Sequence, residues 1–188
     1  MNVPKPSVDT IYTAAATRRL LEALTDEFIQ AMTLIGKLDD RTYTMGLEEK
    51  RSIGAHFRHN YDFVNNCLIG LRSGKIDYTR RERDPLFEEN RLHAIQRISL
   101  IIGDLRALPI ALLERQIQIR SEVDSTVWHL SSALREIEFL HSHTVHHHAM
   151  VAEKLKVFNI HVPDGFGVAP STLEFWAEEK KLLNRSAV

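Results

Sequence analysis

The chain is almost without cysteine, and this limits the chemistry open to it. Cys67 is the only cysteine among 188 residues. A single thiol excludes an internal disulfide, a CxxC redox pair and a zinc site built on several thiolates. Any metal ion must therefore be held by nitrogen and oxygen ligands.

The sequence also lacks an excess of charge of one sign and any long apolar run. Lys and Arg number 24 against 25 Asp and Glu, which gives a formal net charge of -1. Without a basic excess to neutralise phosphates, nucleic acid is not an expected partner. No stretch approaches the ~18 consecutive apolar residues that a membrane span requires, and the N-terminal ten residues have no apolar run. We therefore expect a cytoplasmic protein with no membrane partner.

Apolar residues recur at helical spacing in four long segments. These segments are 8–38, a second from the N-cap Ser52 to Gly74, a third from Leu92 to Leu108 before Pro109, and a fourth capped by Ser131 or Ser132 and ending near Asn159. Amphipathic helices of this kind bury their apolar faces against one another. The sequence predicts an all-α fold, a four-helix bundle forming one domain over residues 1–188.

The connections between these helices are less regular. Residues 39–46 and 75–88 have the polar composition of connections, and we predict a long loop for the second. Between Leu113 and Val127, apolar residues alternate with polar ones at period two. We expect an irregular segment there that contains a short strand.

A short last helix is predicted beyond a turn-rich tail. Ser171 and Glu174 have the spacing of a capping box. The helix is expected to run through Trp176 to Leu183.

Half of the ten histidines lie on the fourth predicted helix, namely His141, His143, His146, His147 and His148. His143 and His147 are one turn apart on one face, so both imidazoles can reach one ion. Leu140, Thr144 and Val151 belong to the same stripe, which directs this face into the bundle. The other three histidines lie on the flanks and are weaker candidates.

The second helix offers His56 and His59 beside apolar residues. Neutral imidazole suits zinc, nickel, iron or copper. Three such ligands leave a coordination position for water or substrate, as in catalytic sites. We predict His59, His143 and His147 as metal ligands, with His56 as a further candidate. The alternative is a set of interior histidines bonded to backbone, but burying several imidazoles together without an ion would be costly.

Two other metal chemistries are disfavoured by the spacing of the residues. A zincin needs HExxH, and here Thr144 follows His143. A ferritin-like di-iron bundle needs Glu-x-x-His on two helices, and only Glu138 with His141 has that spacing.

The segments SIGAHFRHNYDF at 52–63 and HTVHHHAMVAEKL at 143–155, with FGVAPST at 166–172, resemble the DinB-like superfamily of metal-binding helical bundles. The resemblance implies an up-down-down-up bundle, often dimeric, with zinc or nickel on His59, His143 and His147. It also implies enzymes that use the metal to activate a low-molecular-weight thiol, such as bacillithiol or mycothiol, for transfer or isomerisation. His56 is additional to the minimal triad of the superfamily.

Three functional hypotheses follow from these patterns. The preferred one is a metal-dependent enzyme of the thiol S-transferase or hydrolase type, acting on a small molecule through a metal-activated water or thiol. The second is a non-catalytic, homodimeric metal-binding or stress-associated module in which the ion links two helices. The third is a bare helical bundle whose histidines serve packing.

Several other side chains have two interpretations. Arg80, Arg81 and Arg83 could bind a carboxylate or phosphate near a site, but a solvated loop paired with Glu82 and Asp84 is favoured.

Asp62 follows His59 by three residues, so it either orients a histidine or is a charge on the helix surface. Cys67 falls on the apolar stripe and is predicted to be a small buried hydrophobic residue rather than a nucleophile.

Overall fold

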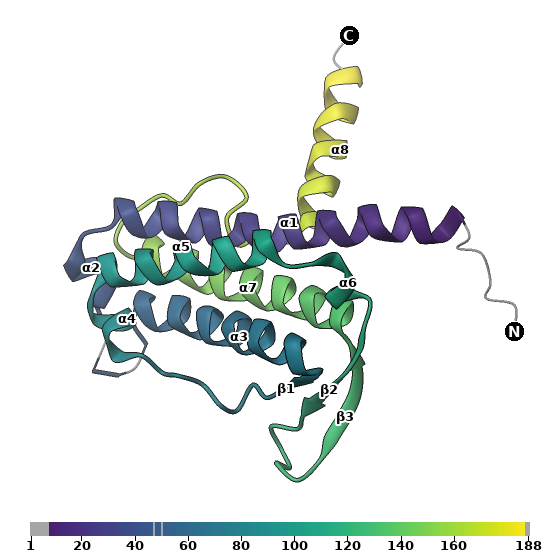
Figure 1. Cartoon of the computed structure of the whole chain (residues 1–188). Coiled ribbons are helices and arrows are strands. Elements are labelled where there is room, and N and C mark those ends of the chain that lie inside the picture. Colours follow the sequence, from purple (N-terminus) through teal and green to yellow (C-terminus); the bar gives the residue numbers. More distant parts are fainter. Residues whose placement is uncertain (1–7, 47, 50, 187–188) are drawn as a thin grey trace, which may run out of the picture.

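The computed structural model describes residues 8–46, 48–49 and 51–186, with side chains described over 14–46, 48–49 and 51–184. Its helices are α1 (Val8–Lys37), α2 (Asp40–Thr44), α3 (Ile53–Ser73), α4 (Pro85–Glu89), α5 (Arg91–Ala107), α6 (Ile110–Leu113), α7 (Ala133–Lys156) and α8 (Pro170–Ser186). Its strands are β1 (Lys75–Ile76), β2 (Gln116–Arg120) and β3 (Trp128–Ser132) (Figure 1).

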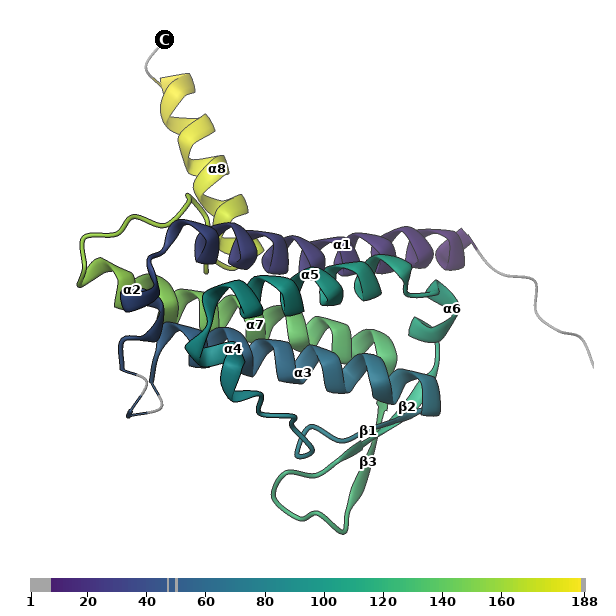
Figure 2. The ribbon, with the colours of Figure 1, turned by 60° about the vertical axis from the view of Figure 1, so that its left-hand side comes forward.

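The four long helices α1, α3, α5 and α7 lie side by side. Helix α1 packs against α5 and α7, and α3 packs against the same two helices. Along the chain they run in the order up, down, down, up, so that α3 and α7 are antiparallel neighbours (Figure 2). Their apolar faces meet in a core that includes Leu24, Phe28, Ile35, Phe57, Leu71, Ile98, Leu105, Ile137, Leu140 and Leu155.

The ends of the helices lie where capping residues predict them. The Ser52 hydroxyl accepts a hydrogen bond from the Ala55 N–H at 3.0 Å and begins α3. Gly74 ends the same helix in the left-handed conformation, with φ of 78°. Of the two serines considered for α7, Ser132 is the N-cap, because its hydroxyl accepts from the Arg135 N–H.

The prediction of a purely all-α fold is wrong, because a small mixed sheet lies at one end of the bundle. Strand β1 pairs in parallel with β2, and β2 pairs antiparallel with β3. Ile76 pairs with Ile119, and Ile76 and Ile117 are buried against the core. The strand expected between Leu113 and Val127 is therefore confirmed as β2. Strand β3 was missed because its residues are largely exposed and carry no alternating apolar pattern.

Two predicted connections contain short helices. Asp39 accepts from the Thr42 N–H and begins α2 within the segment 39–46. Pro85 occupies the first turn of α4, where its missing N–H costs no intrahelical hydrogen bond. The expected long loop at 75–88 is thus interrupted by β1 and by the start of α4.

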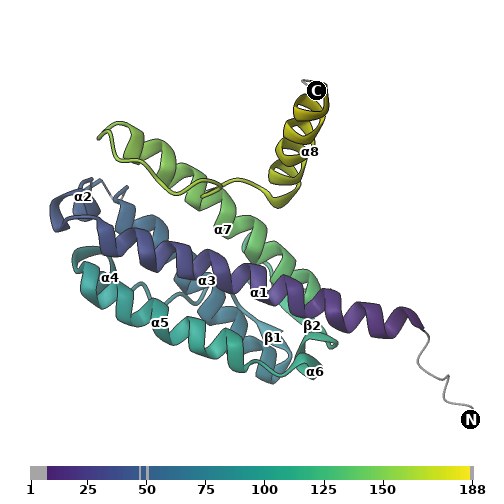
Figure 3. The same cartoon turned by 90° about the horizontal axis from the view of Figure 1, so that it is seen from above.

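The last helix, α8, is longer than predicted and projects away from the bundle (Figures 1 and 3). It begins at Pro170, so Ser171 lies inside the helix and is not its N-cap. Phe175 and Trp176 on this helix are exposed. In the part of the chain that the structure describes, no helix has the length and apolar character needed to cross a membrane.

Candidate metal centre

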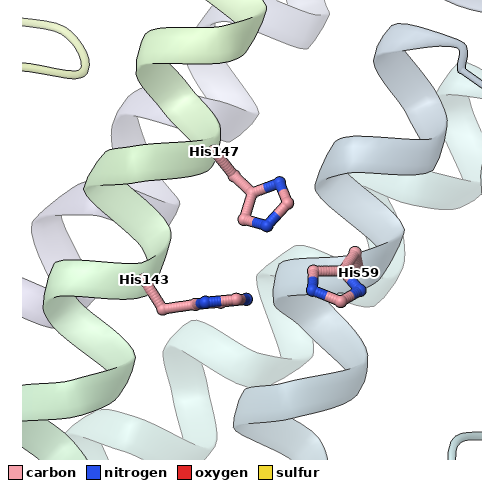
Figure 4. A group of neighbouring side chains, drawn as sticks. All are labelled: His59, His143 and His147. Atoms are coloured by element: carbon pink, nitrogen blue, oxygen red, sulfur yellow. The ribbon is translucent and has the colours of Figure 1, made fainter.

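Three histidines from two helices meet between α3 and α7. His59 comes from α3, and His143 and His147 come from α7, facing it (Figure 4). One ligand-capable nitrogen from each lies within 4.8 Å of the other two. Because a tetrahedral zinc with bonds of about 2.1 Å separates its nitrogens by about 3.4 Å, modest side-chain rotations would bring all three onto one ion.

The packing of α7 explains why its two histidines face α3. His143 and His147 are separated by four residues, so one turn of helix places them on the same face. Thr144 between them is buried, and its hydroxyl donates to the Leu140 carbonyl at 2.7 Å. The predicted apolar stripe of Leu140, Thr144 and Val151 is buried, but His143 and His147 themselves are only half-buried. The interpretation of His141 and His148 as flanking residues is wrong, because both are buried.

The ring nitrogens of the three histidines differ in whether they have hydrogen-bond partners. Nδ1 of His147 lies 3.0 Å from Nδ1 of His56, and Nδ1 of His59 lies 3.2 Å from Nη1 of Arg81. Nε2 of His143 is buried and has no hydrogen-bond partner among the described residues. A buried imidazole nitrogen without a partner costs free energy unless an ion or water satisfies it. This orphaned atom therefore fits a metal site.

The histidines of the cluster are held in the form that binds metals. Burial first, and then the neighbouring histidines, lower the pKa of His59 to about 4 and that of His147 to about 3. Burial also lowers the pKa of His143 and His56. All four imidazoles are thus neutral near pH 7, which is the form that coordinates metal ions.

An apolar wall closes one side of the cluster. The Phe63 ring stacks on His143 with centroids 4.8 Å apart and contacts His59 at 4.6 Å. Phe139 lies 5.4 Å from His143. These rings exclude water from that side and lower the local dielectric around the histidines.

The other side opens into a cavity of about 480 Å³. Its lining consists of Arg51, Ala55, His56, Arg58, His59, His147, Met150 and Lys154. Two members of the histidine cluster therefore face space large enough for a small molecule. An ion held here would be accessible, as in a catalytic site rather than a closed structural one.

The other histidines have different surroundings. His56, the further ligand candidate, contacts His147 but is not one of the three that converge. His148 is buried on another side of α7, where its Nδ1 lies 2.8 Å from the Glu27 carboxylate and its ring stacks on Phe166. His141 is also buried, and His146 meets only the edge of His147 among the cluster.

The arginine-rich loop differs from the expected solvated segment. Arg81 extends toward His59 and lies over the Phe63 ring. The acids of the loop pair with α5 rather than with their neighbours, since Glu82 bonds Arg97 and Asp84 bonds His93, both at 2.6 Å.

Asp62 and Cys67 are both buried. Asp62 accepts a hydrogen bond from Arg58 at 2.8 Å, so it is not a surface charge, and burial raises the pKa of its carboxyl. Cys67 packs in the core, and burial raises the pKa of its thiol to about 12. The prediction of a buried cysteine is confirmed, and a thiol of this pKa is not an activated nucleophile.

Two cations beside the cluster were missed by sequence reasoning. Lys154 lies seven residues after His147, two helical turns along the same face, and this spacing could have revealed it. Arg51 immediately precedes the N-cap of α3, a position with no periodic signal.

Comparisons of the chain with models of known protein families, with curated proteins and with solved structures gave no significant match. The structure is a mostly helical protein with a three-histidine cluster that could hold a metal ion.

Proposed function

We propose that the protein is a metal-dependent enzyme in which His59, His143 and His147 hold a divalent ion beside a cavity that admits a small-molecule substrate. One observation carries the proposal: three neutral, half-buried imidazoles, one from α3 and two from α7, converge within 4.8 Å. Imidazole ligands suit zinc, nickel, iron or copper, and the resemblance to the DinB-like superfamily favours zinc or nickel among these.

The chemistry of the site follows from its surroundings. When bound, the ion would supply Lewis-acid activation of a water molecule or a thiol. His56 would accept a hydrogen bond from Nδ1–H of His147 and fix the orientation of that ring. Phe63 and Phe139 would keep water from the opposite side, so substrate would approach through the cavity.

The preferred reaction class is thiol S-transfer or hydrolysis. It is supported by the resemblance of the histidine segments to the DinB-like superfamily, whose up-down-down-up arrangement matches the order of α1, α3, α5 and α7. A low-molecular-weight thiol is the substrate that this resemblance favours. The cavity beside His56, His59 and His147 has room for such a molecule. The cytoplasm, where such thiols are abundant, is the proposed location.

A second candidate is a non-catalytic, homodimeric metal-binding or stress-associated module. The observation that favours it is the projecting helix α8, whose Phe175 and Trp176 are 57% and 51% exposed. Apolar surface of this kind is typical of protein interfaces. The ion would then join α3 to α7 without taking part in a reaction.

Elemental analysis of untagged protein tests the metal site. We expect one equivalent of zinc or nickel in the unaltered chain, and loss of most of it in His143→Ala and His147→Ala. His129→Ala, which changes an exposed histidine on β3, is the matched control and should retain the metal. Absence of stoichiometric metal after reconstitution of the unaltered chain with either ion would overturn the proposal.

Spectroscopy of a cobalt-substituted sample then separates the two candidates. Added thiols should change the visible spectrum if a coordination position is open to the cavity. An unchanged spectrum would count against the enzyme and favour the non-catalytic module.

A further inference from the structure

We propose that the cavity beside the three histidines selects small molecules with a negatively charged group, such as a carboxylate, which Arg51 and Lys154 bind. The inference deepens the proposed function and rests on it. The inference specifies the charge of the substrate, which the metal site alone does not determine.

Arg51 and Lys154 reach the same cavity from different elements. Arg51 precedes the N-cap of α3, and Lys154 lies on α7 two turns beyond His147. Both line the cavity of about 480 Å³ together with His56, His59 and His147. A molecule that touches the histidines therefore lies next to two cationic side chains.

The charge of this lining is of one sign. Arg51, Arg58 and Lys154 contribute positive charge, and none of the lining residues is acidic. Arg58 is already committed, because it forms ion pairs with Asp62 and Glu88. Within the described part of the chain, neither Arg51 nor Lys154 belongs to an ion pair with a carboxylate.

A second pocket, of about 220 Å³, shares these two cations with the cavity beside the histidines. Its lining includes Arg51 and Lys154 together with Thr42, Met45, Gly46, Ile53, Val157 and Phe158. Most of this second lining is apolar. The two cations thus border both the cavity with the histidines and a mostly apolar pocket. This arrangement fits an anion that carries a reactive group and an apolar group.

Three small thiols of similar length and different charge test the inference on the cobalt-loaded full chain. Thioglycolate is anionic, mercaptoethanol is neutral and cysteamine is cationic. We expect thioglycolate to bind about tenfold more tightly than mercaptoethanol and cysteamine to bind most weakly, as titrated by the cobalt spectrum. Equal affinities would overturn the inference and leave the metal site standing, whereas absence of cobalt binding would overturn both.

Charge-removing variants test whether the carboxylate of thioglycolate binds to the two cations or directly to the metal ion. In the double variant Arg51→Gln with Lys154→Gln, the preference for thioglycolate should fall to about twofold or less, while cobalt affinity should not fall. Lys156→Gln, on the same helix but outside the cavity, should retain the full preference. A preference that survives the double variant would come from chelation and would overturn the inference.

An alkyl extension of the same acid tests the apolar pocket. A mercaptoalkanoate with a butyl chain at the α-carbon should bind at least about threefold more tightly than thioglycolate, because burying even one methylene contributes about 0.8 kcal/mol, a factor of about four. Phe158→Ser should remove this gain without changing the affinity for thioglycolate. No gain in the unaltered chain would overturn the apolar part of the inference.

Discussion

Nδ1 of His56 lies 3.0 Å from Nδ1 of His147, which joins a residue outside the histidine cluster to one inside it. Two neutral imidazoles at this distance share one hydrogen, so one ring donates and the other accepts. If His147 coordinates an ion through Nε2, its hydrogen is on Nδ1 and His56 is the acceptor. His56 is then a positioning residue that sets the orientation of a ligand.

Replacing His56 tests this role. His56→Ala should weaken metal binding by about tenfold to a hundredfold, the usual effect of removing a hydrogen-bond partner of a ligand. His56→Asn, whose amide oxygen can accept the same hydrogen bond, should recover part of the affinity. The measurement is competition with a chromophoric chelator. A change in the cobalt spectrum as large as that of His147→Ala would instead identify His56 as a ligand.

Removing Arg81 should strengthen metal binding. Arg81 faces Nδ1 of His59 at 3.2 Å, and its guanidinium can only donate, so this nitrogen must accept. A ring that coordinates through Nε2 carries its hydrogen on Nδ1, and the Arg81 contact is then lost. Arg81→Ala should raise the metal affinity by up to about tenfold, because binding no longer breaks a charged hydrogen bond.

Isothermal titration with zinc measures this change, with Arg80→Ala as the control from the same loop. Weaker binding by Arg81→Ala would show that the guanidinium supports the metal-loaded site instead of competing with it.

The metal-free protein should lose stability as the pH falls below about 6.5. Burial and the neighbouring histidines lower the pKa of His59 to about 4 and that of His147 to about 3 in the folded protein. In the unfolded chain, the pKa of each side chain is near 6.5. Between these limits the unfolded chain binds protons that the folded chain does not, so protonation favours unfolding. Above pH 6.5 both states are neutral and the two histidines contribute no pH dependence.

Denaturant unfolding of metal-free protein from pH 7.5 to pH 4.5 measures the effect. The variant His59→Gln with His147→Gln should show a smaller loss of free energy of unfolding over this range. An unchanged slope would show that the two rings are protonated in the folded protein.

Gly167 should not tolerate a side chain. Its φ is 73°, and an added Cβ would collide with the backbone of Ala149 on α7. Gly167→Ala should lower the free energy of unfolding by about 2 kcal/mol or more. Gly165→Ala is the matched control, because Gly165 also has a positive φ of 83° but only ordinary contacts around its Cβ position. Equal losses in the two variants would show that strain of the backbone, and not the collision, decides the cost.

The sequence contains most of the information about the helices and about two of the clustered histidines. The caps Ser52, Gly74 and Ser132 act locally, through hydrogen bonds to residues three or four positions away, so their effect can be predicted without the fold. The face shared by His143 and His147 follows from helical geometry alone. Two strands of the sheet were missed. β1 has only two residues and β3 is largely exposed, so neither has a strong sequence pattern.

The surroundings of the site depend on contacts that span long stretches of sequence. His56 meets His147 across 91 residues, and Arg81 meets His59 across 22. No local pattern indicates which charged loop residue turns toward the histidines. The interpretation of residues 80–84 as solvated therefore followed the average behaviour of charged loops, from which Arg81 departs.

The segment 160–169 gives α7 a fixed rotation about its own axis. Phe166 stacks on His148, and Gly167 lies against Ala149, while the carboxylate of Glu27 on α1 contacts Nδ1 of His148. Side chains of adjacent helical residues point about 100° apart around the helix axis. Contacts that fix the direction of His148 therefore also fix the direction of His147 toward α3. A chain that ends before Phe166 should keep every histidine of the cluster, but the orientation of His147 toward α3 should be less fixed.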